Sequence, residues 1–341
     1  MNTPKNAWFI NFTGIGNGII IAPILRCFEA SFPSVKYFHS ENKVLSDDWF
    51  VSRAQLNNLV GFSPIAWRRF TKEDWPKIAD FMREHQIDLV INLRNEGPRY
   101  ADISYYQFKD WVKNILGQVS FWDLDFEEIE KRQEQQNLTK DIIELFRGKG
   151  VSFDRYNPLW LKTTETQKTG IGFGMAASQK NKRWSVQKWI SLGFLIRNTL
   201  GEQMVLFPGM SDEEVQQAEE VRMALGNDLC RMVTRESLPA VANQISSLRC
   251  FVSNDTGLLH IAAAEDIPSV GLYTSTDPSV WAPNKNSSFK TIENSFFKAK
   301  CPDRKVYCGN CFHYYDPCPA IAEYGDDIDP TEVIKAIKEL L

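Results

Sequence analysis

The stretch SNDTGLLHIAAA at residues 253–264 constrains the fold of this chain more than any other part of it. It follows a short apolar run at residues 249–252 that suits a buried strand, and it leads through a tight turn into a helix. Asp255 or Thr256 can cap this helix, and Gly257 lets the backbone come close to a ligand. The free N–H groups and the dipole of such a helix start form an anion site at the carboxyl end of a strand. The sequence therefore predicts an α/β fold with an anion-binding turn.

A second polar turn follows in the next β-α unit. Residues 268–273 predict a buried strand, which ends in the sequence TSTDP at residues 274–278. This turn is rich in hydroxyl groups and backbone donors. Two adjacent polar turns indicate one shared ligand.

Taken together, the two turns resemble the heptosyltransferases of glycosyltransferase family 9. That family has an Asp-Thr/Ser-Gly-x-x-His-x-x-Ala-Ala run, followed by a strand and Thr-Asp-Pro. In the family this loop holds the diphosphate of a sugar nucleotide, usually ADP-heptose. The resemblance thus implies that the donor is bound by Asp255, Thr256, Gly257, His260 and Thr276. For His260 the alternative is a helix residue that packs inward.

Length and composition set broad limits. The chain has 341 residues, of which 43% are hydrophobic, and this suits two domains with a core each. The net charge is −4 and the sequence pI is about 5.7, and no run of basic residues is present. We therefore expect no nucleic-acid partner, and anionic ligands must be met by local groups.

The first apolar run, residues 18–25, is far shorter than the roughly 20 residues that a membrane helix needs. An arginine follows it instead of a small-residue cleavage site. We therefore expect no signal peptide, no transmembrane segment and a cytoplasmic location. In that compartment, seven cysteines point to thiols or metal ligands and not to disulfides.

A β-loop-α unit opens the chain, with a strand at residues 7–12 and a glycine-rich turn at residues 13–18. The turn lacks the full Gly-x-Gly-x-x-Gly spacing of dinucleotide-binding proteins. This disfavours the alternative that the chain is a nicotinamide-dependent oxidoreductase. In family 9 the equivalent loop reads Gly-Asp, and that Asp is the proposed base for the acceptor hydroxyl. Here the loop reads Gly16-Asn17. An amide can orient a hydroxyl but cannot take its proton at neutral pH.

The catalytic base must therefore be elsewhere or absent. A loop dense in titratable groups, residues 94–102, follows the strand predicted at residues 88–93. Glu96 and Asp102 are the candidate bases in this loop. The alternative is that both are solvated loop carboxylates.

A second domain opens with a strand near residues 169–175 and a polar loop. Here the family runs from a hydroxyl pair through a lysine to an aromatic residue, and the hydroxyl and the lysine contact phosphate. Ser178 and Lys182 fall on those positions, while Ala177 replaces the first hydroxyl. A lysine is a point charge suited to a diphosphate, and Arg183 is a near alternative. A solvated basic turn remains the other interpretation.

Two further β-α units, with strands at residues 204–207 and 229–233, imply a parallel sheet. In the family the adenine lies across the loops that end these strands. Met210 and Met232 are therefore candidates to line the nucleotide site. Both are equally compatible with ordinary core positions.

Four of the seven cysteines, Cys301, Cys308, Cys311 and Cys318, gather within 18 residues. Thiolates at such spacing can close a tetrahedral shell around a structural zinc or iron ion, and His313 can replace one of them. Some family members bind a metal in a finger of this kind. Free or redox-active thiols are the alternative. A closed four-ligand shell would fix a loop or a surface and not do chemistry.

The resemblance as a whole implies a GT-B fold, in which two Rossmann-like, doubly wound α/β domains face one another. We expect an acceptor-binding domain at residues 1–155, a linker at 156–168 and a nucleotide-sugar domain at 169–341. The last would include the cysteine finger at 301–318 and a helix at 330–341. The implied reaction is inverting transfer of a sugar, heptose from ADP-heptose, onto an acceptor hydroxyl without a catalytic metal.

Because Asn17 replaces the expected Asp, a second hypothesis is a nucleotide-sugar-binding scaffold or regulator without turnover. The sequence leaves the acceptor open among a glycan, a protein and a small molecule. It also leaves open whether the chain forms an oligomer.

Overall fold

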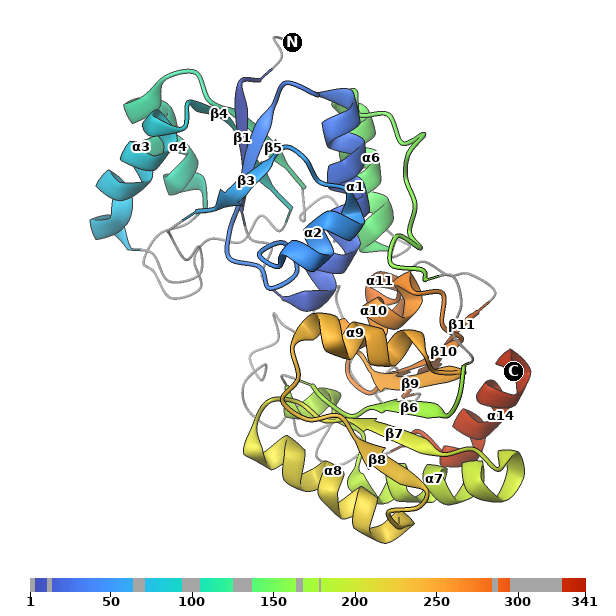
Figure 1. Cartoon of the computed structure of the whole chain (residues 1–341). Coiled ribbons are helices and arrows are strands. Elements are labelled where there is room, and N and C mark those ends of the chain that lie inside the picture. Colours follow the sequence, from blue (N-terminus) through green and yellow to red (C-terminus); the bar gives the residue numbers. More distant parts are fainter. Residues whose placement is uncertain are drawn as a thin grey trace. The chain divides into compact units, whose positions relative to one another are not determined.

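The structure is a computed structural model that describes residues 4–10, 14–63, 71–93, 105–124, 137–163, 168–177, 179–283, 288–294 and 327–341. The chain divides into two compact units, Met1–Pro158 and Leu159–Leu341. Each unit is built around one parallel β-sheet with helices packed on it (Figure 1). This confirms the predicted α/β fold with two doubly wound sheets.

The sheet of the first unit has the strand order β3-β2-β1-β4-β5, and every pair is parallel. Its strands are β1 (Asn6–Ile10), β2 (Lys36–His39), β3 (Leu59–Phe62), β4 (Ile87–Asn92) and β5 (Ser120–Asp123). The helices between and after them are α1 (Ile15–Ser31), α2 (Asp48–Ala54), η1 (Lys72–Asp74), α3 (Trp75–Glu84), α4 (Tyr105–Leu116) and α6 (Leu138–Gly148).

The central strand β1 shows why helices cover both faces of this sheet. Successive side chains of a strand point to opposite faces, and both kinds are apolar here. Trp8 makes edge contacts with Phe81 of α3 and Phe108 of α4, at ring-centroid distances of 5.5 and 6.3 Å. On the other face, Phe9 makes an edge contact with Phe28 of α1, at a ring-centroid distance of 5.6 Å. Such a strand can only be buried between two helical layers.

The sheet of the second unit has the order β11-β10-β9-β6-β7-β8 and is also parallel throughout. Its strands are β6 (Ile171–Gly174), β7 (Met204–Phe207), β8 (Cys230–Met232), β9 (Cys250–Asn254), β10 (Ser269–Tyr273) and β11 (Phe289–Glu293). Its helices are η2 (Lys180–Lys182), α7 (Val186–Leu200), α8 (Asp212–Leu225), α9 (Leu238–Ser246), α10 (Gly257–Ala264), α11 (Pro278–Trp281) and α14 (Pro330–Leu340).

Both sheets reverse their winding direction at one point. In the first sheet this switch point lies between β1 and β4, and in the second between β6 and β9. Ligands of open α/β sheets bind beyond the carboxyl ends of the strands at such a point. The second switch point is tightly packed, because a Cβ atom on Gly172 of β6 would lie 2.4 Å from the ring of Phe251 of β9. Glycine is required there by close approach.

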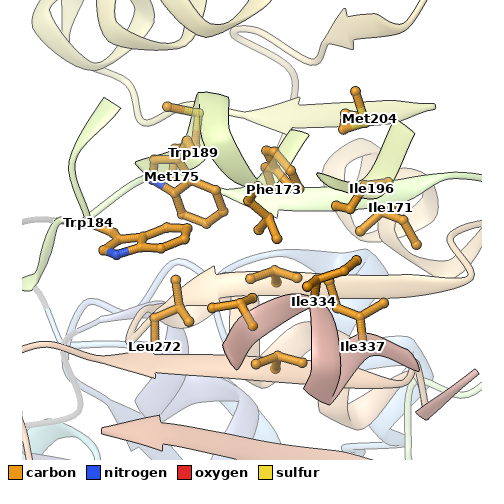
Figure 2. Close-up of a cluster of buried hydrophobic side chains, with 14 of the residues drawn as sticks. Ile171, Phe173, Met175, Trp184, Trp189, Ile196, Met204, Leu272, Ile334 and Ile337 are labelled. Carbon is orange, nitrogen blue, oxygen red and sulfur yellow. The ribbon is translucent and has the colours of Figure 1, made fainter. Parts of the chain in front are cut away.

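A buried cluster holds the helices of the second unit against its sheet (Figure 2). Trp189 of α7 packs on Phe173 of β6, and Ile337 of α14 belongs to the same cluster. Ser185 caps α7, because its side chain accepts a hydrogen bond from the Lys188 amide. Full burial of such side chains stabilises a fold by about 1.5–3 kcal/mol each. The cluster thereby gives the loops at the switch point a rigid base.

Candidate functional site

The loop after β6 and the loop after β9 meet at the switch point of the second sheet. The fully buried side chain of Asn254, the last residue of β9, fixes both ends of the β6 loop. Its Nδ2 donates to the Met175 carbonyl at 2.8 Å, and its Oδ1 accepts from the Trp184 amide at 3.2 Å. The Trp184 indole in turn donates to the Ile328 carbonyl at 3.1 Å. The loop that carries Lys182 therefore starts and ends on one amide side chain.

Lys182 points from this loop to Asp255 in the loop after β9. Its Nζ donates to Asp255 Oδ2 at 2.8 Å, and the two side chains are 22% and 7% exposed. The Thr276 hydroxyl donates to the same Asp255 oxygen at 2.8 Å. Burial alone would raise the pKa of Asp255, but Lys182 and Thr276 hold that pKa below its ordinary value. The carboxylate is therefore ionised at neutral pH.

The helix start next to this ion pair is open to an anion. Thr256 is the N-cap of α10, and among the residues that the structure describes no side chain caps the helix. The ammonium of Lys182 has three N–H donors, of which the described contacts use one, with Asp255. Uncapped amides and a fixed cation side by side form a site for phosphate oxygens.

His260 lies in the second turn of α10 and is 7% exposed. Burial lowers its pKa to about 4, although the nearby charge of Asp255 acts in the opposite direction. The imidazole is therefore neutral at pH 7. It can meet a ligand as a hydrogen-bonding group but not as a cation.

The turn after β10 joins the other two loops. Thr274 donates its hydroxyl to the carbonyl of Asn181, the residue before Lys182, at 2.8 Å. Thr276 reaches Asp255, as described above. One turn of hydroxyl residues thus holds both partners of the ion pair.

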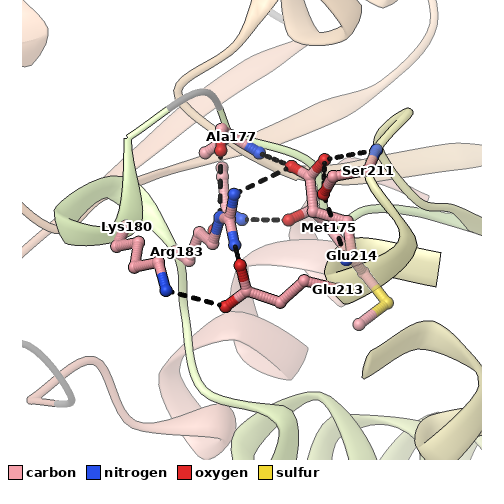
Figure 3. A network of polar contacts seen from close by, with 8 residues as sticks. Met175, Ala177, Lys180, Arg183, Ser211, Glu213 and Glu214 are labelled. Atoms are coloured by element: carbon pink, nitrogen blue, oxygen red, sulfur yellow. Dashed lines mark hydrogen bonds and ion pairs between the residues drawn. The ribbon is translucent and has the colours of Figure 1, made fainter. Parts of the chain in front are cut away.

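Arg183, the expected alternative to Lys182, points into a different network (Figure 3). Its Nε donates to the Ala177 carbonyl at 2.9 Å, and its guanidinium lies 3.3 Å from Glu214. Glu214 also accepts from the Ala177 amide and from Ser211, where it closes the capping box of α8. Arg183 therefore braces the loop and is not grouped with Lys182 and Asp255.

The two methionines expected at the nucleotide differ in their surroundings. Met210, in the loop after β7, is 68% exposed. Met232, at the end of β8, is partly buried and packs against the hydrophobic cluster of the second unit. Only Met210 presents its side chain to solvent at the carboxyl edge of the sheet.

Asn17 lies in the first turn of α1 and is partly buried. The turn before it is held by Asn42, which donates to the Gly14 carbonyl at 3.0 Å. A Cβ atom on Gly18 would lie 2.4 Å from Asn42 Oδ1 and 2.6 Å from Val44 Cβ. Gly18, next to Asn17, is therefore tightly packed, and α1 follows β1, which pairs with β4 at the switch point of the first sheet.

The sequence pattern of glycosyltransferase family 9 (heptosyltransferase) matches residues 113–308, more than half of the chain. The chain belongs to glycosyltransferase family 9. The matched range includes Lys182 and Asp255 together with His260 and Thr276.

Curated relatives of this family 9 protein include two heptosyltransferases. Lipopolysaccharide heptosyltransferase 1 of Salmonella typhimurium is 37% identical over 105 residues, which are 31% of this chain and 32% of that protein. Lipooligosaccharide heptosyltransferase 2 of Haemophilus influenzae is 31% identical over 142 residues, 40% of this chain and 39% of that protein. The aligned part thus spans about a third of the length of these relatives.

Solved structures show the same two-domain fold over almost the whole length. Escherichia coli heptosyltransferase WaaC with ADP superposes with a TM-score of 0.63 at 17% identity, covering 98% of this chain and 100% of that one. A family 9 glycosyl transferase of Veillonella parvula gives 0.68 at 16% identity, covering 98% and 97%. The iron-containing glycosyltransferase TibC of enterotoxigenic E. coli gives 0.52 at 10% identity, covering 100% and 77%.

Several predicted site residues of this family 9 protein lie outside the described residues. They are Glu96, Asp102, Ser178, the four cysteines Cys301, Cys308, Cys311 and Cys318, and His313. Within the described ranges, no group of three or more His, Cys, Asp or Glu side chains could hold a metal ion. In the same ranges, no helix is both long and apolar enough to cross a membrane.

The sequence analysis did not identify two residues that hold the loops around Lys182 and Asp255 in this family 9 protein. The sequence pattern does indicate a role for Glu214, because Ser211-x-x-Glu214 has the spacing of a helix capping box. The indication for Asn254 is weaker, a polar residue at the end of an apolar run. Its role depends on Met175 and Trp184, which lie far away along the chain.

The site generates one prediction about stability. Replacing Glu214 by Ala should lower the free energy of unfolding by about 2 kcal/mol, because it removes a capping-box bond and the nearer and more buried of the two carboxylates that contact Arg183, leaving only Glu213 at 3.6 Å. Urea unfolding followed by tryptophan fluorescence measures the change. The control is Glu213→Ala, whose side chain is 48% exposed and which should keep the urea midpoint of the wild type. Equal effects of the two substitutions would contradict the bracing role of Glu214.

Proposed function

We propose that this chain is an inverting glycosyltransferase that transfers heptose from ADP-heptose to an acceptor hydroxyl. The observation that carries the proposal is the fixed Lys182–Asp255 pair beside the uncapped start of α10, at the switch point of the second sheet. Membership of family 9 supports the reaction class. The names of the relatives, all heptosyltransferases, support the sugar, and the ADP bound by WaaC supports the nucleotide.

In the proposed reaction the acceptor oxygen forms a bond to the anomeric carbon on the face opposite the leaving group. The bond from that carbon to the diphosphate oxygen breaks, and its electron pair leaves with ADP. Negative charge therefore grows on the diphosphate as the oxocarbenium-like transition state forms. In this proposal, Lys182 and the backbone amides of Thr256 and Gly257 stabilise this charge, which the fixed Lys182–Asp255 pair and the uncapped start of α10 support. The Ser178 hydroxyl is proposed as a further phosphate contact.

Asp255 serves two purposes in this proposal. It orients the Lys182 ammonium, and its second oxygen, Oδ1, accepts no hydrogen bond from the described residues, which leaves it open to a sugar hydroxyl. His260, which is neutral, adds a hydrogen-bonding group to the same site. Met210 is exposed on the loop where the adenine is proposed to lie.

The base that takes the acceptor proton is proposed to be Glu96 or Asp102, since the amide of Asn17 cannot accept a proton at neutral pH. Both carboxylates follow β4, the strand next to β1 at the first switch point. Asn17 would then orient the acceptor hydroxyl.

Asn17 also favours a second candidate function, a nucleotide-sugar-binding scaffold without turnover. The two candidates differ in one comparison, between the wild type and Asn17→Asp with ADP-heptose and a panel of acceptors. Turnover by the wild type would establish a transferase whose base is not residue 17. Tight binding with turnover only by Asn17→Asp would establish the scaffold.

The transferase proposal predicts that Lys182→Ala lowers kcat/KM for ADP-heptose roughly a hundredfold or more, because one fixed donor to the developing charge is lost. Release of ADP measures the rate, with GDP- and UDP-sugars as donor controls. The matched control is Lys180→Ala, which removes the same charge from the same loop. Lys180 is 79% exposed and pairs with Glu213, so its loss should leave kcat/KM near the wild-type value. Similar losses in both variants would contradict a specific role for Lys182.

We further propose that Cys301, Cys308, Cys311 and Cys318 hold one structural zinc or iron ion. Their spacing supports this, and the structural neighbour TibC is described as iron-containing. Purified protein should then carry about one metal ion per chain by plasma mass spectrometry, and Cys311→Ser should lose it. Cys230→Ala is the control, because Cys230 is a free buried thiol in β8. Metal-free protein with wild-type folding would disprove the site.

A further inference from the structure

The hydroxyl of Thr276, a turn residue, is buried against the carboxylate of Asp255. Thr276 is 7% exposed, and its Oγ1 lies 2.8 Å from the Asp255 oxygen that also accepts from Lys182. Two donors from different loops therefore meet at one carboxylate oxygen. Neither donor belongs to the loop of Asp255 itself.

The turn that carries Thr276 is anchored on both sides. Before it, Thr274 donates to the Asn181 carbonyl at 2.8 Å. After it, Asp277 caps α11 by accepting from the amide and the hydroxyl of Ser279, at 2.8 and 2.6 Å. The Thr276 hydroxyl is thereby presented to Asp255 by a backbone whose anchors do not use the Lys182 side chain.

Lys182 has to serve two anions once a donor is bound. Its ammonium contacts Asp255 through one of its three N–H donors, and a diphosphate at the α10 start would share the same cation and weaken its hold on Asp255. The Thr276 hydroxyl does not face this competition, because it carries no charge and lies on the turn after β10. It is the contact to Asp255 that persists when Lys182 engages phosphate.

We propose that Thr276 is a positioning residue, which holds the Asp255 carboxylate in place while Lys182 engages the diphosphate of the donor. The inference rests on the proposed transferase function. It changes the role expected for Thr276 from a phosphate ligand to a residue that acts through Asp255. The open Oδ1 of Asp255 then keeps a constant direction toward the transferred sugar.

Asp255 is faced by charged and titratable groups from each element around it. These are Lys182 of η2, His260 of α10 and Tyr273 of β10. Lys182, His260 and the Thr276 hydroxyl all act to lower the pKa of Asp255 against the effect of burial. The pKa of the Tyr273 phenol is raised by burial and by the Asp255 charge, so this phenol remains neutral. Loss of the Thr276 hydroxyl should therefore raise the pKa of Asp255.

The test is Thr276→Val, which keeps the shape of the side chain and removes the hydroxyl. At pH 7, kcat with ADP-heptose should fall roughly tenfold while KM for the donor changes little. The acid limb of the kcat profile should move up by about one pH unit, since Asp255 is needed as a carboxylate and loses a donor. Thr276→Ser restores the hydroxyl and should return both quantities to near the wild-type values.

Ser275→Ala is the matched control. Ser275 lies in the same turn and is 1% exposed, but its buried hydroxyl has no hydrogen-bond partner among the described residues. Its removal should leave the acid limb of the profile in place. Thr276→Ala, which also lacks the hydroxyl, replaces Thr276→Val if that variant does not fold.

An unshifted acid limb and an unchanged kcat in the folded variants would overturn the positioning role. So would an equal shift in Ser275→Ala. If the wild type itself transfers no sugar from ADP-heptose, the proposed function fails instead. Calorimetric titration of ADP separates the two cases, because Thr276→Val should bind ADP about as tightly as the wild type.

Discussion

The candidate site of the second unit is organised by the need to pair one buried charge. Asp255 is 7% exposed, and an ionised carboxylate at such depth is unstable unless cations and hydrogen-bond donors surround it. Lys182 and Thr276 meet this requirement from two other loops. The pairing therefore brings together the loops after β6, β9 and β10. It also leaves the ammonium of Lys182 beside the start of α10. A phosphate bound there would be stabilised by the ammonium and by the free amides of the helix start.

The fold makes this arrangement possible through packing that is remote from the ligand. Asn254 fixes both ends of the β6 loop, and the close contact of Gly172 with Phe251 brings β6 and β9 together. The Arg183–Glu214 contact then braces the same loop from the side of α8. The loop that carries Lys182 is thus held at its ends and along its length. A charge fixed in this way need not be reorganised when the transition state forms.

Local features of the chain were predictable from sequence because their causes are local. The apolar runs predicted the strands, and residues 253–264 predicted the strand-turn-helix junction of β9 and α10. The directions of Lys182 and Arg183 were not predictable. Both are cations in one polar loop, and their opposite roles are decided by Asp255 and Glu214, which are distant in sequence.

Contacts between distant residues of the N-terminal unit were also not predictable from the sequence. The sequence identified Asn17 as a departure from the family pattern, and the structure places it in the first turn of α1, next to the tightly packed Gly18. Nothing in the sequence indicated a second polar cluster, in which Asp123 at the end of β5 accepts hydrogen bonds from Tyr105 and Lys109 of α4. That cluster depends on how α4 packs on the sheet, and this is a tertiary effect.

We propose that Lys182 and Asp255 act as one unit in binding the donor diphosphate. A double-mutant cycle tests it directly, with ADP affinity measured for the wild type, Lys182→Ala, Asp255→Asn and the double variant. The losses in ADP affinity should not be additive. The double variant should bind ADP more tightly than the sum of the single losses implies, by roughly 1 kcal/mol or more, because Lys182→Ala alone leaves an unpaired carboxylate beside the phosphates. Additive losses would show that Lys182 and Asp255 act independently of each other.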